Sequence, residues 1–181
     1  MEEELENPYL TAFYEHLHAN PGKHNPHALP LQLYFAQQRA QREQASPYFN
    51  GFQILDRCLL EYYHIFVKNL VNIGMINENE FGVYMKVYSA FPHSLKHPNV
   101  IVLLKSDVST NYERIQRRAR NCESATIDLS YLNSLKVQYE HYERILENEH
   151  PDIKLIQINT DELNPEDVFE IVIRQLSELT K

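Results

Sequence analysis

Glycine is scarce in this sequence, with only four residues among 181. A phosphate-binding loop of the type G-x-x-x-x-G-K-[ST] needs glycines so that backbone N–H groups can approach a triphosphate. The Gly-Lys pair at Gly22-Lys23 is followed by His24, and Leu17 stands where the first glycine of the motif belongs. The printed sequence therefore contains no such loop.

Cysteines and long apolar runs are also few. Cys58 and Cys122 are the two cysteines and form no C-x-x-C pair. This excludes a disulfide scaffold or a thiolate zinc cage and favours a reducing compartment, the cytoplasm or the mitochondrial matrix. The longest apolar run, Val100 to Leu104, is far too short to span a bilayer. The acidic residues 1–4 do not resemble a signal peptide. We expect no membrane association.

Basic residues are outnumbered, 17 against 25 acidic ones, which gives a net charge of −8. A nucleic acid is therefore not expected as a partner, since duplex binding needs a basic surface. Four arginines nevertheless fall within seven positions, at Arg114, Arg117, Arg118 and Arg120. Guanidinium groups bind phosphate oxygens in a bidentate manner. The cluster indicates either a site for one small anionic ligand or a solvated basic face.

The pattern of apolar residues predicts a single α/β domain over residues 1–181. Strands are expected at 52–55, 100–104 and 154–158. Helices are expected at 7–19, 31–45, 59–73, 78–90, from 107 to about 120, 127–148 and 165–179, and a proline-rich loop at 20–30. Strands that alternate with long helices indicate a parallel sheet. The uninterrupted apolar strand at 100–104 predicts a sheet covered on both faces.

A charged pair, Asp56-Arg57, follows the first expected strand. Ligands of parallel α/β sheets bind at the carboxyl ends of the strands, so this pair is well placed for a site. The alternative, that the pair only solvates the end of a strand, stays open.

Five segments together resemble the deoxynucleoside kinases. They are E-E-x-x-x-N-P-Y-L-x-x-F-Y at 2–14, P-L-Q-L-Y-F-x-x-x-R at 30–39, L-D-R-C at 55–58, R-I-x-x-R-x-R-x-x-E at 114–123 and I-D-L-S-Y-L at 127–132. They occur in the order of the family and cover nearly the whole chain. The resemblance implies a P-loop-kinase-like parallel sheet flanked by helices. It also implies transfer of the γ-phosphoryl group of ATP to the 5′-hydroxyl of a deoxynucleoside.

The resemblance also implies roles for residues of the reaction centre. Glu2 is similar to the general base that accepts the 5′-hydroxyl proton, Arg57 to the arginine that steadies the phosphoryl group, and Asp56 to the carboxylate near Mg²⁺. The implied lid over the ATP phosphates consists of Arg114, Arg118 and Arg120. Such roles suit phosphoryl transfer, where catalysis consists of positioning and charge neutralisation.

Substrate-binding residues are implied in the same way. Gln32 resembles the glutamine that reads the base edge, with Arg39 further along the same helix, and Tyr14 and Glu123 resemble the pair that grips the sugar 3′-hydroxyl. A base-reading carboxylate that some purine-accepting members place five residues after the arginine is replaced by Tyr62. The base preference therefore stays open.

The first strand and the P-loop of the family are not in this chain, and they would occupy the middle of the sheet. We therefore expect weak or no phosphoryl transfer by these 181 residues alone. Three hypotheses stay open: a kinase in its complete form, a non-catalytic subunit, and a nucleotide-binding α/β domain without kinase ancestry. We expect a homodimer, common in this family, or a partner chain that covers the exposed sheet edges.

Overall fold

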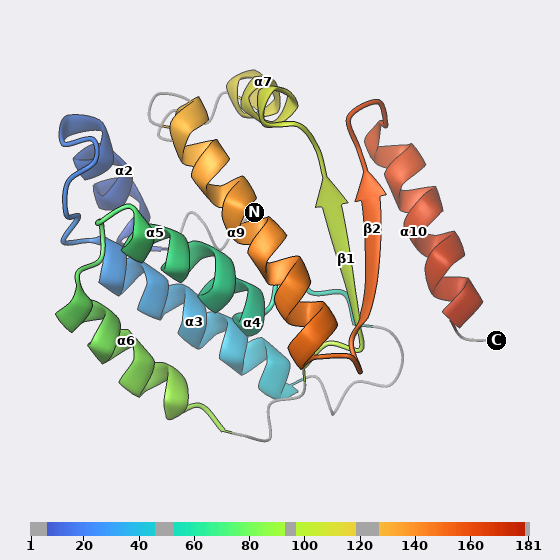
Figure 1. The fold of residues 1–181 in the computed structure, drawn as a ribbon, viewed down its shortest axis with the longest axis horizontal. Coiled ribbons are helices and arrows are strands. Elements are labelled where there is room, and N and C mark those ends of the chain that lie inside the picture. Colours follow the sequence, from blue (N-terminus) through green and yellow to red (C-terminus); the bar gives the residue numbers. More distant parts are fainter. Residues whose placement is uncertain (1–6, 46–52, 93–96, 119–126, 180–181) are drawn as a thin grey trace.

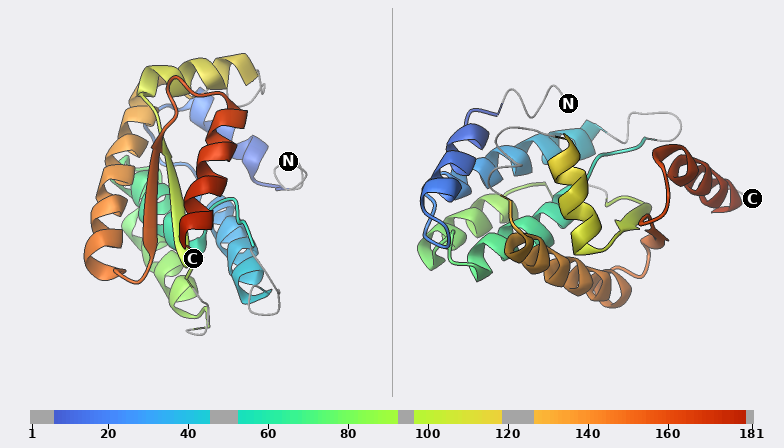
Figure 2. Two further views of the ribbon diagram at one scale, coloured as in Figure 1. Left: turned by 90° about the vertical axis from the view of Figure 1, so that its right-hand side faces the viewer. Right: turned by 90° about the horizontal axis from the view of Figure 1, so that it is seen from above.

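The computed structural model describes residues 7–45, 53–92, 97–118 and 127–179. Helices α2 (Leu10–Ala19), α3 (Ala28–Ala45) and α6 (Glu78–Ser89) gather on one side of the molecule, together with the helical run that contains α4 and α5. The two strands and α10 (Pro165–Leu179) lie on the other side, and the long helix α9 (Leu129–Glu149) runs between the two groups (Figure 1). The view from above shows the same separation (Figure 2).

One continuous helical run follows the Asp56-Arg57 pair. It consists of α4 (Leu59–Glu61), the π-helical segment η2 (Tyr62–Val67) and α5 (Lys68–Asn72). The sequence predicts one helix over 59–73, and the run confirms it, although the π-helical turns within it are not foreseen. It ends at Gly74, whose φ of 75° suits a residue without a Cβ atom.

The strands β1 (Val100–Lys105) and β2 (Lys154–Asn159) pair in parallel, from Val100 opposite Lys154 to Lys105 opposite Asn159. Helix α7 (Val108–Arg118) follows β1, and α9 precedes β2. This confirms the expected α/β class with a parallel sheet. A buried cluster joins α4 and η2 to α9 and to the start of β2. Its members are Cys58, Leu60, Ile65, Tyr142, Leu146 and Ile153.

Two expectations about the sheet are wrong. Residues 53–55 of the expected strand at 52–55 adopt no strand, and Ile54 is 77% exposed. A strand is defined by hydrogen bonds to a neighbour, and no described strand lies beside this segment. The sheet is also not covered on both faces, because only Leu103 of β1 is buried and Leu104 is 54% exposed.

Helix boundaries differ from the expected ones near the N-terminus. Helix α2 begins at Leu10 rather than at Asn7, whose Oδ1 atom instead accepts a hydrogen bond from the backbone N–H of Tyr9 at 3.0 Å. Helix α3 begins at Ala28, inside the expected loop, and takes Pro30 into its first turn. Proline is tolerated there because the first N–H groups of a helix have no intrahelical partner.

Asn77 caps α6, since Asn77 and Glu80 exchange reciprocal hydrogen bonds at the start of this helix. The Asp128 side chain likewise caps α9 by accepting from the N–H of Tyr131. A screen of the described residues for a helix long and apolar enough to cross a bilayer finds none.

Candidate functional site

A cavity of about 1710 Å³ lies among α2, α3, η2, α7, α9 and the carboxyl ends of the two strands. In open α/β sheets this is the edge where ligands bind. All the expected site residues that fall in the described part of the chain line the cavity: Tyr14, Gln32, Arg39, Asp56, Arg57, Arg114 and Arg118. Three others, Glu2, Arg120 and Glu123, lie outside the described residues.

Arg57 has a left-handed backbone, with a φ of 66°, which is strained for a residue that carries a Cβ atom. Its guanidinium carbon lies 4.5 Å from the centre of the Phe66 ring and 6.0 Å from that of Tyr62. Its Nε atom lies 3.9 Å from Oε1 of Glu61. Burial acts to lower the pKa of Arg57, but Tyr139, Tyr62 and Glu61 together raise it above its ordinary value. The guanidinium is therefore a permanent cation at the cavity wall.

Glu61 and Tyr139 are parts of this site to which we assign no role from the sequence. The Tyr139 hydroxyl donates a hydrogen bond to Oε1 of Glu61 at 3.1 Å. Burial raises the pKa of Glu61, while Arg57 and the Tyr139 hydroxyl act to lower it. Arg57 and Glu61 are four residues apart, but Arg57 lies before α4 and has a left-handed backbone, so the i, i+4 spacing of a helix does not reveal the pair. Tyr139 lies 78 residues away from Glu61, and no local pattern joins the two.

Aromatic rings form one wall of the cavity. Tyr62 is buried, and its ring centre lies 5.3 Å from that of Phe35 and 5.1 Å from that of Phe66. The guanidinium carbon of Arg39 lies over the Tyr62 ring at 5.3 Å. Flat apolar surfaces next to cationic groups can bind the face of a nucleobase.

Gln32 lies on α3, the helix that also contributes Phe35 to the aromatic wall, and is 5% exposed. Its Oε1 atom is buried and has no hydrogen-bond partner among the described residues. A buried acceptor without a donor costs about 1–3 kcal/mol. Gln32 also lines the cavity, so a turn of its side chain would offer this unused hydrogen-bonding capacity to a ligand.

The expected lid arginines are in different situations. Arg114 donates from Nη1 to the hydroxyl of Thr160 at 2.9 Å and from Nη2 to the Thr160 carbonyl at 2.5 Å. These bonds join α7 to the end of β2, a structural tie that the spacing of the arginines does not indicate. Arg118 lies on the last turn of α7, is exposed and lines the cavity. Tyr14 lines the cavity from α2, edge-on to Phe13 at 5.4 Å.

Asp56 supplies a carboxylate at the cavity wall beside Arg57. The described residues include no group of three or more potential metal ligands. Mg²⁺ commonly binds through one or two carboxylates together with substrate phosphates and waters. The Asp56 carboxylate, in a cavity wide enough for phosphates, therefore fits that ion.

The fold and the cavity define an α/β protein with a ligand site at the carboxyl ends of parallel strands. A family model described as deoxynucleoside kinase matches residues 1–181. The chain belongs to the deoxynucleoside kinase family. This confirms the family indicated by the five sequence segments.

Individual relatives show the extent of the similarity. The deoxyadenosine kinase of Dictyostelium discoideum is 28% identical over 172 residues, which are 94% of this chain and 65% of that protein. The deoxyadenosine/deoxycytidine kinase of Bacillus subtilis is 27% identical over 179 residues, 98% of this chain and 78% of that protein. This chain thus spans about two thirds to four fifths of their length.

A solved structure shares the fold. The structure of deoxyadenosine kinase from M. mycoides with bound dATP superposes with a TM-score of 0.72 and 21% identity. The match covers 96% of this chain and 82% of that one. This confirms the expected kinase-like α/β fold.

Proposed function

We propose that the protein is a deoxynucleoside kinase, a single-domain enzyme that transfers the γ-phosphoryl group of ATP to the 5′-hydroxyl of a deoxynucleoside. The buried, unpartnered Oε1 atom of Gln32 at the wall of an aromatic cavity carries this proposal. The named activities of the relatives support it. We further propose that it works in a reducing compartment, the cytoplasm or the mitochondrial matrix.

In this proposal the base lies against the aromatic wall formed by Phe35, Tyr62 and Phe66. Gln32 accepts a hydrogen bond from an N–H group of the base, and Arg39 lies beside it as a cation over Tyr62. Tyr14 and Glu123 hold the sugar 3′-hydroxyl. The cavity is larger than the usual 300–1,000 Å³ or so of a small-molecule pocket and has room for a nucleoside and a nucleotide together.

The chemical step needs a base and a cation. Glu2 accepts the proton of the 5′-hydroxyl while the 5′-oxygen of the deoxynucleoside forms a bond to the γ-phosphorus. The bond between the γ-phosphorus and the bridging oxygen breaks at the same time, and ADP leaves. Arg57 neutralises charge on the transferred group, and Arg114, Arg118 and Arg120 contact the phosphates. Mg²⁺, held through Asp56, neutralises charge on the phosphate oxygens when bound.

Nucleoside binding tests the first half of the proposal by calorimetry on the 181-residue chain. We expect Gln32→Ala to weaken deoxyadenosine or deoxycytidine binding about tenfold or more, since a buried hydrogen bond to the ligand is lost. Gln37→Ala is the matched control, because Gln37 lies on the same helix and is exposed. Equal effects of the two variants, or equal affinity for ribonucleosides and deoxyribonucleosides, would contradict the proposal.

A non-catalytic subunit is the second candidate. It is favoured by the two-stranded sheet, in which β1 pairs only with β2 among the described residues, so a second copy or another chain could cover the other edge. The intact mass of the protein from its natural source separates the two. A mass above 21.4 kDa with peptides that contain G-x-x-x-x-G-K-[ST] supports the kinase. A mass of 21.4 kDa without ATP-dependent phosphorylation supports the subunit.

A further inference from the structure

The Arg57 side chain is held by contacts that come from the helix following it. Residues 53–55 form no strand, so no sheet hydrogen bonds fix the segment that leads to Arg57. The left-handed backbone of Arg57 also has to be maintained by its surroundings. Its side chain is 42% exposed. The orientation of the guanidinium therefore depends on side chains of that helix, namely Glu61 at 3.9 Å, the Phe66 ring at 4.5 Å and Tyr62.

Glu61 is itself restrained from a different part of the molecule. Its side chain is 17% exposed, and its carboxylate accepts a hydrogen bond from the hydroxyl of Tyr139, which lies on α9. Both contacts, from Arg57 and from Tyr139, reach the same oxygen, Oε1. Arg57 and Tyr139 line the cavity, whereas Glu61 does not. Glu61 is thus placed between two cavity residues without facing the ligand itself.

We propose that Tyr139 and Glu61 form a positioning pair that orients Arg57 toward the transferred phosphoryl group. This inference rests on the proposed function for the role of Arg57. The hydrogen bond from Tyr139 selects one carboxylate rotamer of Glu61, and that rotamer directs Oε1 at Nε of Arg57. At 3.9 Å this contact is an ion pair rather than a hydrogen bond, and its loss lets the guanidinium turn on its long side chain.

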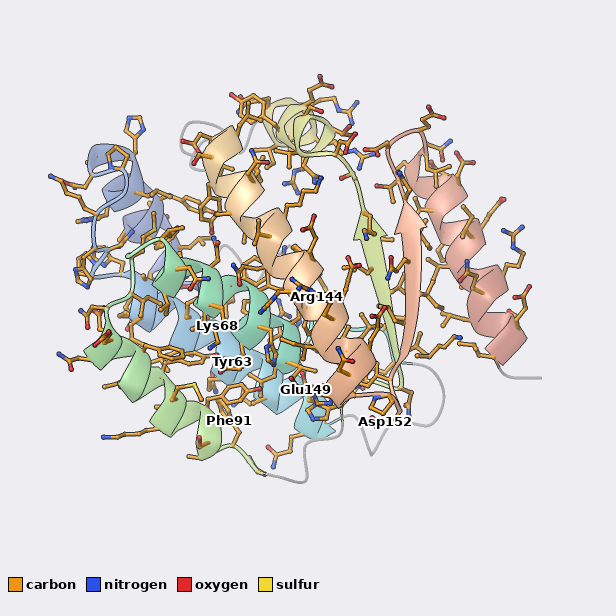
Figure 3. The ribbon with its side chains drawn as sticks, in the orientation of Figure 1. Tyr63, Lys68, Phe91, Arg144, Glu149 and Asp152 are labelled. Carbon is orange, nitrogen blue, oxygen red and sulfur yellow. The ribbon has the colours of Figure 1, made fainter. Side chains whose placement is uncertain are left out.

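Helix α9 offers a close control for Tyr139. Tyr142 lies one turn further along α9 and is 1% exposed, but its hydroxyl meets Sγ of Cys58 at 3.8 Å. Tyr139→Phe and Tyr142→Phe therefore each delete one oxygen from the same helix, and only the first touches Glu61. Glu61→Gln tests the carboxylate, and its control is Glu149→Gln, at the exposed end of α9 (Figure 3).

The first measurement is the ¹⁵N-detected Nε–Hε resonance of Arg57 in the 181-residue chain, assigned by its loss in Arg57→Lys. We expect this resonance to shift or broaden in Tyr139→Phe and in Glu61→Gln and to stay unchanged in Tyr142→Phe and Glu149→Gln. The double variant Tyr139→Phe/Glu61→Gln should look like Glu61→Gln alone, because the two residues act in series. The same Arg57 resonance in Tyr139→Phe and in the unmodified chain would overturn the proposal.

The second measurement is turnover by the complete protein. We expect Tyr139→Phe to lower kcat about tenfold with KM for the deoxynucleoside within twofold, since Arg57 is then oriented less firmly toward the transferred group. Tyr142→Phe should keep kcat within twofold. Equal kcat values for the two variants would overturn the inference. If the unmodified protein transfers no phosphoryl group, the proposed function fails, and the Arg57 resonance still decides the positioning role.

Discussion

A buried carboxylate in α3 holds the first turn of α4, and its replacement should change stability in a pH-dependent way. Glu43 is 3% exposed, and its Oε1 atom accepts a hydrogen bond from the backbone N–H of Leu59 at 2.5 Å. Glu43→Ala leaves that N–H without an acceptor. We expect a loss of about 2 kcal/mol in the free energy of unfolding, or roughly 4–8 °C in Tm for a chain of this size.

Glu43→Gln keeps an acceptor and removes the charge. Burial raises the pKa of Glu43, against the lowering effect of the Leu59 N–H and of Arg39. Because the folded pKa lies above the unfolded value, the carboxyl group's contribution to stability is fully present below the unfolded pKa. That contribution is lost as the pH rises through the raised folded pKa. A glutamine cannot ionise, so the stability of Glu43→Gln relative to the unmodified chain should increase from pH 4 to pH 8.

Urea unfolding followed by circular dichroism at pH 4, 6 and 8 measures both variants, with the exposed Glu149→Ala as the control. We expect Glu43→Ala to be destabilised and Glu43→Gln to be at least as stable as the unmodified chain at pH 8. The reasoning would be refuted if both variants lost the same stability at pH 8, because the charge rather than the acceptor would then hold the helix start.

Three other changes test separate features. Burial, together with Lys68, lowers the pKa of His64 to about 4, so the stability present above pH 6.5 should decline as the pH falls toward 4. His64→Phe should reduce that decline in Tm, and an equal decline would contradict it. In urea unfolding, Gly74→Ala should cost about 1 kcal/mol because the φ of Gly74 is 75°. Gly82→Ala should stabilise by about 0.5–1 kcal/mol, because Gly82 lies within α6 and a Cβ atom there meets nothing within 4 Å. A change of the same sign in both variants would count against this account. Arg114→Ala should lower the free energy of unfolding by about 1–3 kcal/mol, because the two hydrogen bonds to Thr160 are lost. Arg117 is exposed, so Arg117→Ala should change it by no more than about 0.5 kcal/mol. Equal losses in the two variants would contradict a structural role of the Arg114–Thr160 contact.

The features that could be predicted from the sequence depend on local interactions. The Asn77 cap and the left-handed Gly74 after α5 act within a few residues, and the helices expected at 59–73 and 78–90 are found beside them. The strands at 100–105 and 154–159 are rich in β-branched residues and are also found as expected. The strand expected at 52–55 does not form over its described residues, 53–55, because a strand depends on its neighbour, which no local pattern encodes.

The candidate site shows the same limit. Motif residues from α2, α3 and α7 gather at one cavity, as the resemblance implies. The contact between Glu61 and Tyr139 joins helices 78 residues apart, and the bonds from Arg114 to Thr160 join segments 46 apart. Such pairs arise from how the elements pack against each other. No sequence pattern around either residue identifies its distant partner.

The π-helical segment Tyr62–Val67 has a consequence for how this helix can change. Residues five apart are rotated by about 140° in a regular α-helix, yet Nζ of Lys68 lies over the Tyr63 ring at 5.3 Å (Figure 3). The segment therefore acts as a phase shift of about one residue between the cavity-facing start of the helix and its core-facing end at Leu70. Deleting one residue within it would return the segment to a regular α-helix with Tyr62 still at the cavity and Leu70 still in the core, because the π-helical turns accommodate one extra residue. The loss of one residue is thus better tolerated here than in a regular helix such as α9, where it would rotate every later side chain by about 100°.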